Sequence, residues 1–217
     1  MAAMLARWSF HRILLVWIVS LASAGAAAFE YDGRSSLPQE ATPSWAFVFK
    51  QGSAQTGSEG LRVEATDGQR HLYAIGQSHQ GKPWGEPSVW DMSAGFIQVT
   101  FRLRCEARDP ELEVFRLIIR DGTQQWQVPI TAASVYRKPL DTTEWDTYTA
   151  VVENGKLRVS SERHGLIVEN RKAQPGERGN GLLFGSYFFR KNDSAKPRAW
   201  ELAFLRCSNE PFTSPNR

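Results

Sequence analysis

Residues 95–105 read GFIQVTFRLRC and contain the clearest alternation in the chain. With a period of two, the apolar side chains of this stretch point one way and its polar side chains point the other. The apolar set is Ile97, Val99, Phe101, Leu103 and Cys105, and the polar set is Gln98, Thr100, Arg102 and Arg104. A helix would scatter the same residues around its whole circumference. The pattern therefore predicts a long strand with one face on a core and the other in water.

Turn dipeptides between shorter alternating runs predict the strands on either side. Asp67-Gly68, Asp121-Gly122 and Asn154-Gly155 each stand between two such runs, and dipeptides of this kind supply the positive φ angles of a tight hairpin turn. We expect three antiparallel hairpins, which join residues 61–66 to 72–75, 113–120 to 124–130, and 145–152 to 156–160. About a dozen short strands without a helical period predict an all-β chain, a two-sheet antiparallel β-sandwich.

The order of these segments resembles the concanavalin A-like, laminin-G-like jelly roll. The resemblance covers most of residues 29–207 and rests on FEYDG at 29–33, GFIQVTFRLRC at 95–105, FRLIIRDGTQQWQV at 115–128, DTTEWDTYTAVVENGKLRV at 141–159, GLLFGSYFF at 181–189 and WELAFLRC at 200–207. It implies that the last strand pairs beside the strand at 95–105. Because this fold carries lectins, glycosidases and interaction modules alike, the resemblance indicates a fold more than a function.

The first 28 residues have the three-part layout of a secretory signal peptide. Arg7 and Arg12 flank the start of an apolar run at 13–22, and small residues follow as far as Ala28. The run is shorter than the roughly 20 residues that a membrane-spanning anchor needs. We therefore expect cleavage after Ala26 or Ala28 and a secreted, periplasmic or extracellular protein, with no later segment that inserts into a membrane. Residues 29–208 then form one sandwich domain, and 209–217 form a polar tail.

The mature chain is expected to be close to neutral. The formal net charge of the full chain is +3, and the signal segment contributes Arg7 and Arg12 without any acid, which leaves +1. A balance this even gives no reason to expect nucleic acid or an acidic membrane surface as a partner.

Cys105 and Cys207 are the two cysteines of the chain. Export into an oxidising compartment favours a disulfide between them. Their positions disfavour one, because both stand at the C-terminal ends of predicted strands, and antiparallel neighbours would hold the two sulfurs at opposite ends. Both outcomes remain open from the residues alone.

No metal, cofactor or catalytic group is expected. The histidines and acids considered as metal ligands lack ligand spacing; they are His71, His79, His164, Asp67, Asp121 and Asp193. A retaining glycosidase needs two carboxyl groups about 5 Å apart. Glu144 and Asp146 have a suitable spacing but no further acid follows them, and Glu111 and Glu113 lie next to a loop marked by Asp109-Pro110. The pattern disfavours an enzyme.

Aromatic rings in predicted loops are the candidate ligand-binding groups, because sugars stack on flat rings. The candidates are Trp84, Trp90, Tyr136, Tyr187 and Arg190. The alternative is that these rings cover the ends of the sandwich. A row of arginines, Arg102, Arg104, Arg116 and Arg120, either shares a water-facing surface that meets an anionic glycan or pairs with nearby acids.

The function that these patterns favour is a secreted, non-catalytic binding module for carbohydrate. Two alternatives stay open. One is a glycoside hydrolase of the same superfamily with an unrecognised acid pair, and the other is a structural or protein-interaction domain of the cell envelope. The expected partner is accordingly a glycan or an envelope protein.

Overall fold

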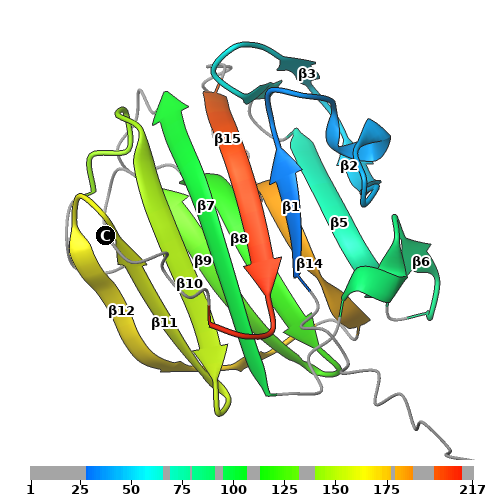
Figure 1. Cartoon of the computed structure of the whole chain (residues 1–217), viewed down its shortest axis with the longest axis vertical. Coiled ribbons are helices and arrows are strands. Elements are labelled where there is room, and N and C mark those ends of the chain that lie inside the picture. The colour runs from blue at the N-terminus through cyan, green and yellow to red at the C-terminus, as the bar shows by residue number, and fades with distance from the viewer. Residues whose placement is uncertain are drawn as a thin grey trace, which may run out of the picture.

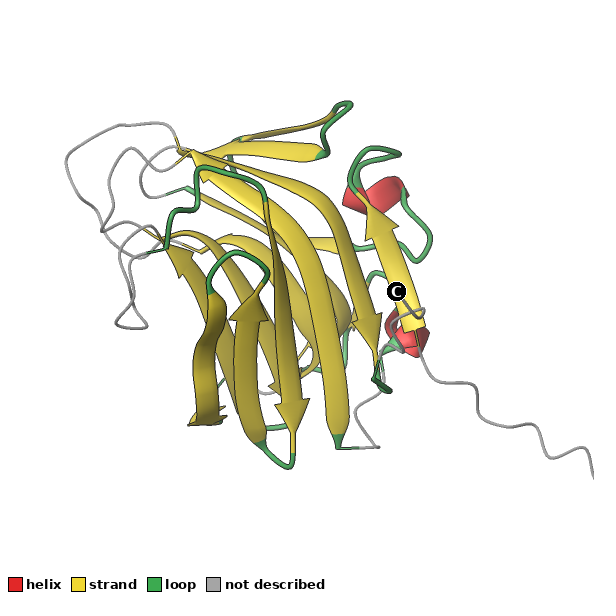
Figure 2. Ribbon diagram, turned by 60° about the vertical axis from the view of Figure 1, so that its left-hand side comes forward, coloured by secondary structure: helices red, strands yellow, loops and turns green. Residues whose placement is uncertain are grey.

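The computed structural model consists of two antiparallel sheets packed face to face (Figures 1 and 2). It describes residues 28–65, 69–78, 80–90, 95–106, 113–131, 140–176, 179–187 and 198–211. The expected signal segment, apart from Ala28, and most of the expected tail lie outside these residues. No helix in the described part of the chain has the length and apolar composition needed to span a bilayer; its helices are the single turns η1 (Pro38–Glu40) and η2 (Pro87–Val89).

The first sheet has eight described strands and the second has seven. The first has the order β12 (Gly165–Lys172), β11 (Lys156–Ser161), β10 (Asp146–Glu153), β7 (Phe96–Glu106), β15 (Arg198–Ser208), β4 (Leu61–Ala65) and β3 (Ser53–Thr56), and β1 (Ala28–Asp32) also pairs with β15. The second has the order β13 (Gln174–Pro175), β9 (Gln124–Thr131), β8 (Glu113–Asp121), β14 (Gly179–Tyr187), β5 (Arg70–Ser78) and β2 (Ala46–Lys50), and β6 (Pro83–Trp84) also pairs with β5. This arrangement confirms the predicted all-β sandwich.

Strand β7 lies in the middle of the eight-stranded sheet, between β10 and β15 (Figure 1). Its five alternating apolar residues, from Ile97 to Cys105, are each no more than 2% exposed, so the predicted inward face is confirmed. The predicted pairing of the last strand beside it is also confirmed, because Leu205 of β15 pairs with Phe101.

An aromatic layer fills the space between the sheets. Phe101 stacks on Tyr148 with ring centroids 5.4 Å apart, and Trp45 meets the ring of Phe184 edge to face at 4.9 Å. The buried indole of Trp200 donates a hydrogen bond of 2.8 Å to Ser186 Oγ. Rings packed in these offset and edge-on geometries add stability beyond the area that they bury.

Two of the three predicted hairpins are confirmed. Strands β10 and β11 pair with Glu153 opposite Lys156, and both turn residues have positive φ, 50° for Asn154 and 72° for Gly155. Strands β8 and β9 pair through the turn after Asp121, where Gly122 has a φ of 59°. These backbone angles belong to the turns whose twist matches that of the paired strands.

The third predicted hairpin is wrong. Residues 61–66 were expected to pair with 72–75, but β4 belongs to the eight-stranded sheet and β5 to the seven-stranded sheet. Leu61 pairs with Leu202, whereas Leu72 pairs with Gly185. The chain therefore crosses from one sheet to the other between these strands. A strand shows the same alternation whichever sheet buries its apolar face, so the local pattern did not distinguish a crossover from a hairpin.

The two cysteines are free and buried. Cys105 pairs with Trp200 and Cys207 pairs with Val99, so the two cysteines lie at opposite ends of the paired region of β7 and β15. Cys105 and Val99, the partner of Cys207, are six residues apart on β7, which is about 20 Å at the rise per residue of a strand. This distance is far too long for a disulfide. Burial raises the pKa of both thiols, so neither is a reactive thiolate.

Candidate functional site

The described structure places two of the five candidate ligand-binding residues in full. Trp84 is half-buried on β6, whereas Trp90 is only 9% exposed and packs with the main core. Tyr187 ends β14 opposite Arg70, and its side chain lies outside the described part. Tyr136 and Arg190 lie outside the described residues altogether. Among the described candidates, Trp84 thus offers the larger ring surface to a ligand.

On the outer face of the seven-stranded sheet, Trp84 packs against a small apolar cluster that includes Leu183 and lies close to the backbone of Gly181. Its cross-strand partner is Gly76, which pairs in turn with Gly181 of β14. A Cβ atom built on Gly181 would lie 3.3 Å from Cε3 of Trp84, so the absence of a side chain there lets the indole approach the sheet closely. The guanidinium carbon of Arg120 lies 5.8 Å from the centroid of the Trp84 ring, within cation–π distance.

A pocket of about 440 Å³ lies at the end of the seven-stranded sheet, one register position along β5 from the Gly76–Trp84 pair, and Trp84 is not among its lining residues. It is lined by Gln77, Ser78, Gly81, Gly122, Thr123, Gly179 and Asn180. The lining therefore contains two amides, two hydroxyls and three glycines, and no charged side chain. This is the chemistry of a site for an uncharged ligand rich in hydroxyl groups, because amides and hydroxyls both donate and accept hydrogen bonds.

Hydrogen bonds hold the walls of this pocket together before any ligand binds. The backbone N–H of Gly122 donates to Asn180 Oδ1 at 2.7 Å, and the N–H of Gly179 donates to the Gly122 carbonyl at 2.9 Å. On the other side, the N–H of Lys82 donates to Ser78 Oγ at 3.1 Å. The side-chain N–H groups of Asn180 make no hydrogen bond to another described residue, which leaves them available to a ligand.

The four arginines do not share one surface. Arg102 and Arg104 belong to β7 in the eight-stranded sheet, whereas Arg116 and Arg120 belong to β8 in the other sheet. Because all four project outward, the two pairs lie on opposite faces of the sandwich. Of the two alternatives, one shared arginine surface is therefore wrong, because alternation within a strand does not tell which sheet the strand joins.

Acids neutralise most of the positive charge near the outer face of β4. Arg62 contacts Glu201 at 2.7 Å, Glu106 at 2.8 Å and Glu64 at 2.8 Å, and Arg104 contacts Glu201 at 2.8 Å. The hydrogen bonds that its N–H groups donate to Glu106 and, next, to Glu64 raise the pKa of the Arg62 guanidinium. Glu201 is 6% exposed, so two guanidinium groups hold a nearly buried carboxylate.

Of the acids considered for catalysis, Glu144 and Asp146 are described, whereas Glu111 and the side chain of Glu113 lie outside the described residues. Glu144 is exposed, but Asp146 is 2% exposed and accepts a hydrogen bond of 3.1 Å from the backbone N–H of Arg163. In the described part of the chain, no group of three or more His, Cys, Asp or Glu residues is arranged to hold a metal ion.

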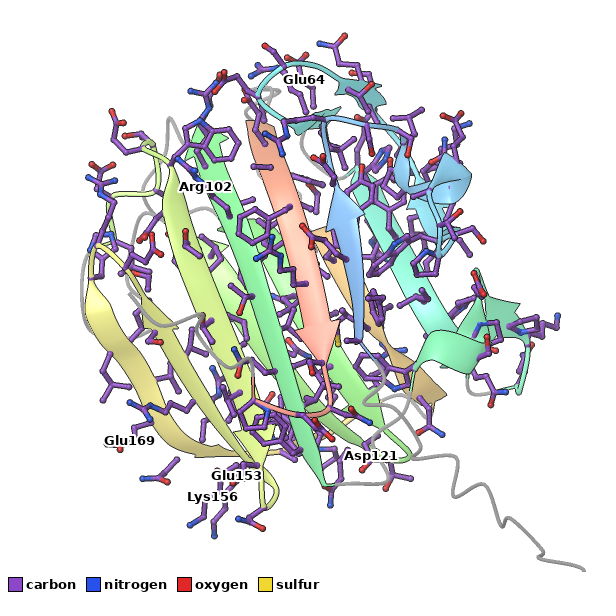
Figure 3. All side chains as sticks on the ribbon, viewed as in Figure 1. Glu64, Arg102, Asp121, Glu153, Lys156 and Glu169 are labelled. Atoms are coloured by element: carbon purple, nitrogen blue, oxygen red, sulfur yellow. The ribbon has the colours of Figure 1, made fainter. Side chains whose placement is uncertain are left out.

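A charged pocket lies at the far end of the eight-stranded sheet. It has a volume of about 350 Å³ and is lined by Val151, Glu153, Asn154, Lys156, Leu157, Arg158, Glu169 and Asn170. A β-bulge sets Glu169 and Asn170 opposite Arg158 alone, and Asn170 has a φ of 56°. Figure 3 shows Glu153, Lys156 and Glu169 gathered at this end, away from Arg102 and Glu64. Its four charges make it less suited to a neutral sugar than the pocket beside Trp84.

Sequence reasoning identified Trp84 but none of the lining residues of its pocket. Gln77, Thr123 and Asn180 come from three segments that are far apart in the chain. The signal present in the sequence was the clustering of glycine with Asn and Thr, as in residues 179–181 and 121–123, and it was read only as turn chemistry.

No protein-family model and no curated protein sequence matches the chain, whereas solved structures do. A sialidase superposes with a TM-score of 0.56 at 10% identity, over 85% of this chain and 19% of that one. The binding domain of botulinum neurotoxin DC gives 0.54 at 8% identity, over 88% of this chain and 49% of that one. Trypanosoma rangeli sialidase gives 0.52 at 8% identity, over 86% of this chain and 31% of that one.

This chain therefore covers between about a fifth and a half of the length of the solved chains that it resembles. At such low identity the likeness concerns the fold and not the activity. The strand order, the central position of β7 and these superpositions agree that the chain is a concanavalin A-like jelly roll.

Proposed function

We propose that the protein is an exported, non-catalytic module that binds a neutral glycan in the pocket beside Trp84. The observation that carries this proposal is the lining of the pocket, which consists of uncharged hydrogen-bonding groups and glycine backbone, with the Trp84 pair one register position away along β5. A pyranose presents hydroxyl groups at its rim and an apolar C–H face. The amides and hydroxyls of the pocket suit hydrogen bonds to the hydroxyl groups of the sugar, and the Trp84 ring suits stacking on its C–H face.

Solved structures with the same fold support the same proposal. The botulinum neurotoxin DC binding domain was solved in complex with SialylT, and the neurotoxin type C structure concerns interaction with two ganglioside molecules. A sialidase is also among the similar structures. Their sequence identities to this chain are about 10% or less. We therefore take from these proteins only that a protein with a concanavalin A-like sandwich can bind sugars.

The experiment is a glycan array followed by calorimetric titration of the best neutral oligosaccharide. Replacing Trp84 with Ala removes the stacking ring, which is worth about 1.4 kcal/mol or a tenfold loss of affinity. Thr123→Ala should lower the affinity by a smaller factor, because it removes one exposed hydroxyl group.

Leu166→Ala is the control, because Leu166 is an exposed apolar side chain on β12 of the other sheet. It should leave neutral-glycan binding unchanged. Absence of binding to any neutral glycan, or an equal loss in Trp84→Ala and Leu166→Ala, would show that the pocket beside Trp84 is not a sugar site.

A further inference from the structure

Arg102 is an exposed cation near the centre of the eight-stranded sheet. It projects outward from β7, the strand between β10 and β15, and Figure 3 shows it on this face. Its guanidinium carbon lies 5.7 Å from the centroid of the Trp145 ring. Arg102 makes no ion pair and no side-chain hydrogen bond with any other described residue. A guanidinium in this position has its donors directed to solvent or to a ligand.

The neighbouring arginines form ion pairs with glutamates. Arg104 is held by Glu201 at 2.8 Å, Arg62 is shared among three glutamates, and Arg206 pairs with Glu30 at 2.8 Å. The glutamates of these pairs are thus engaged with other cations. Arg102 is left as a local positive charge that the protein itself does not neutralise.

The surroundings of Arg102 restrict its position. Trp145 lies against two guanidinium groups, because the guanidinium carbon of Arg104 is also close, 5.1 Å from the same ring. In the sheet register, Thr147 is the neighbour of Arg102 on one side and Phe204 on the other. Stacking on an aromatic face limits the rotation of a guanidinium, so less entropy is lost when a ligand binds.

We propose that Arg102 and Trp145 form a second binding site, which takes the carboxylate of an acidic sugar. The planar fork of N–H donors on Arg102 matches a carboxylate in a bidentate contact. The half-buried ring of Trp145 beside it gives the apolar side of a pyranose a surface for contact. This site lies on the opposite sheet from the Trp84 pocket and does not depend on it.

The rest of the face favours a sugar over an acidic peptide. Hydroxyl and amide groups continue along the outer surface below Arg102, where Thr100 and Thr149 lie 3.4 Å apart through their Oγ1 atoms and Gln98 reaches Thr100 at 3.5 Å. Uncharged hydrogen-bonding groups of this kind suit the hydroxyls of further sugar units. A peptide bound as an added strand would need a free sheet edge, and β7 has paired neighbours on both sides.

The test is calorimetric titration of the full protein with glucuronic-, galacturonic- and sialic-acid oligosaccharides, with a neutral oligosaccharide in parallel. Arg102→Gln should lower the affinity for the preferred acidic sugar by at least about tenfold, the usual effect of losing a charge-assisted contact. Arg102→Lys keeps the charge but loses the bidentate geometry, so a partial loss is expected. Trp145→Ala should also weaken binding.

Arg158→Gln is the control for net charge. Arg158 is an exposed arginine on the same sheet at the charged pocket, and its replacement should leave acidic-sugar affinity unchanged. Thermal melts of all variants establish that each remains folded. The proposal is overturned by no binding of any acidic sugar, by an equal loss in Arg158→Gln, or by binding of an acidic peptide instead. Because Trp84→Ala should not affect this site, failure here and failure of the neutral-glycan proposal are separate results.

Discussion

At the scale of the residue, adjacent positions on β7 have opposite roles. Phe101 is fully buried between Phe115, at 5.6 Å between ring centroids, and Tyr148, at 5.4 Å. Arg102 is exposed on the other face of the strand. Phe101→Ala should leave a cavity in the aromatic layer and lower the free energy of unfolding by about 3 to 5 kcal/mol. Denaturant unfolding of the purified variant measures this loss.

The matched variant for this prediction is Arg102→Ala. It removes an exposed side chain whose described contact is one cation–π pair, so it should cost less than about 1 kcal/mol. Equal unfolding midpoints for the two variants would contradict the inward position of Phe101. A larger loss in the arginine variant would mean that the register of β7 is shifted by one residue.

At the scale of the element, the β10–β11 turn depends on a glycine in the left-handed region. Gly155 has a φ of 72°, and a Cβ atom there would meet nothing within 4 Å, so backbone conformation and not crowding decides the cost of a side chain. Gly155→Ala should therefore destabilise the protein by about 1 to 2 kcal/mol. The measurement is a thermal or urea melt of the variant.

Gly57 provides the control glycine. It also has nothing within 4 Å of a built Cβ, but its φ lies outside the left-handed region. Gly57→Ala should change the free energy of unfolding by no more than about 0.5 kcal/mol, because surface substitutions without special geometry have small effects. Similar losses in the two variants would rule out backbone strain as the cause.

At the scale of the whole molecule, stability should depend on pH through a buried histidine. His71 is 1% exposed on β5; its Nδ1 donates to the Gln51 carbonyl at 3.0 Å, and its Nε2 accepts from the Tyr73 hydroxyl at 3.0 Å. Both bonds suit the neutral ring. Burial, as the main cause, lowers the pKa of His71 in the folded state.

The unfolded chain then binds a proton at a higher pH than the folded chain. His71 costs no stability above its unfolded pKa of about 6.5, and stability is lost as the pH falls below that value. Urea unfolding at pH 7.5, 6.5 and 5.5 should show this decline, and the decline should be shallower in His71→Gln, which cannot take up the proton. The same pH slope in both proteins would exclude His71 as the cause.

Much of the fold was determined by the sequence alone. The burial of alternate residues on β7 follows from a period of two, because neighbouring side chains on a strand point to opposite faces. The turn at Asn154 and Gly155 follows from the residues that tolerate positive φ. Both features depend on forces between residues close in the chain, and the structure confirms both.

Only the tertiary structure decided which strands are neighbours and which side chains meet. The sequence could not place β4 and β5 in different sheets, because each strand buries the same kind of face in either arrangement. The pocket beside Trp84 and the contact of Arg102 with Trp145 likewise depend on strand pairing between distant segments. Alternation reports whether a side chain is buried, but the partner that buries it is chosen by the packing of the whole sandwich.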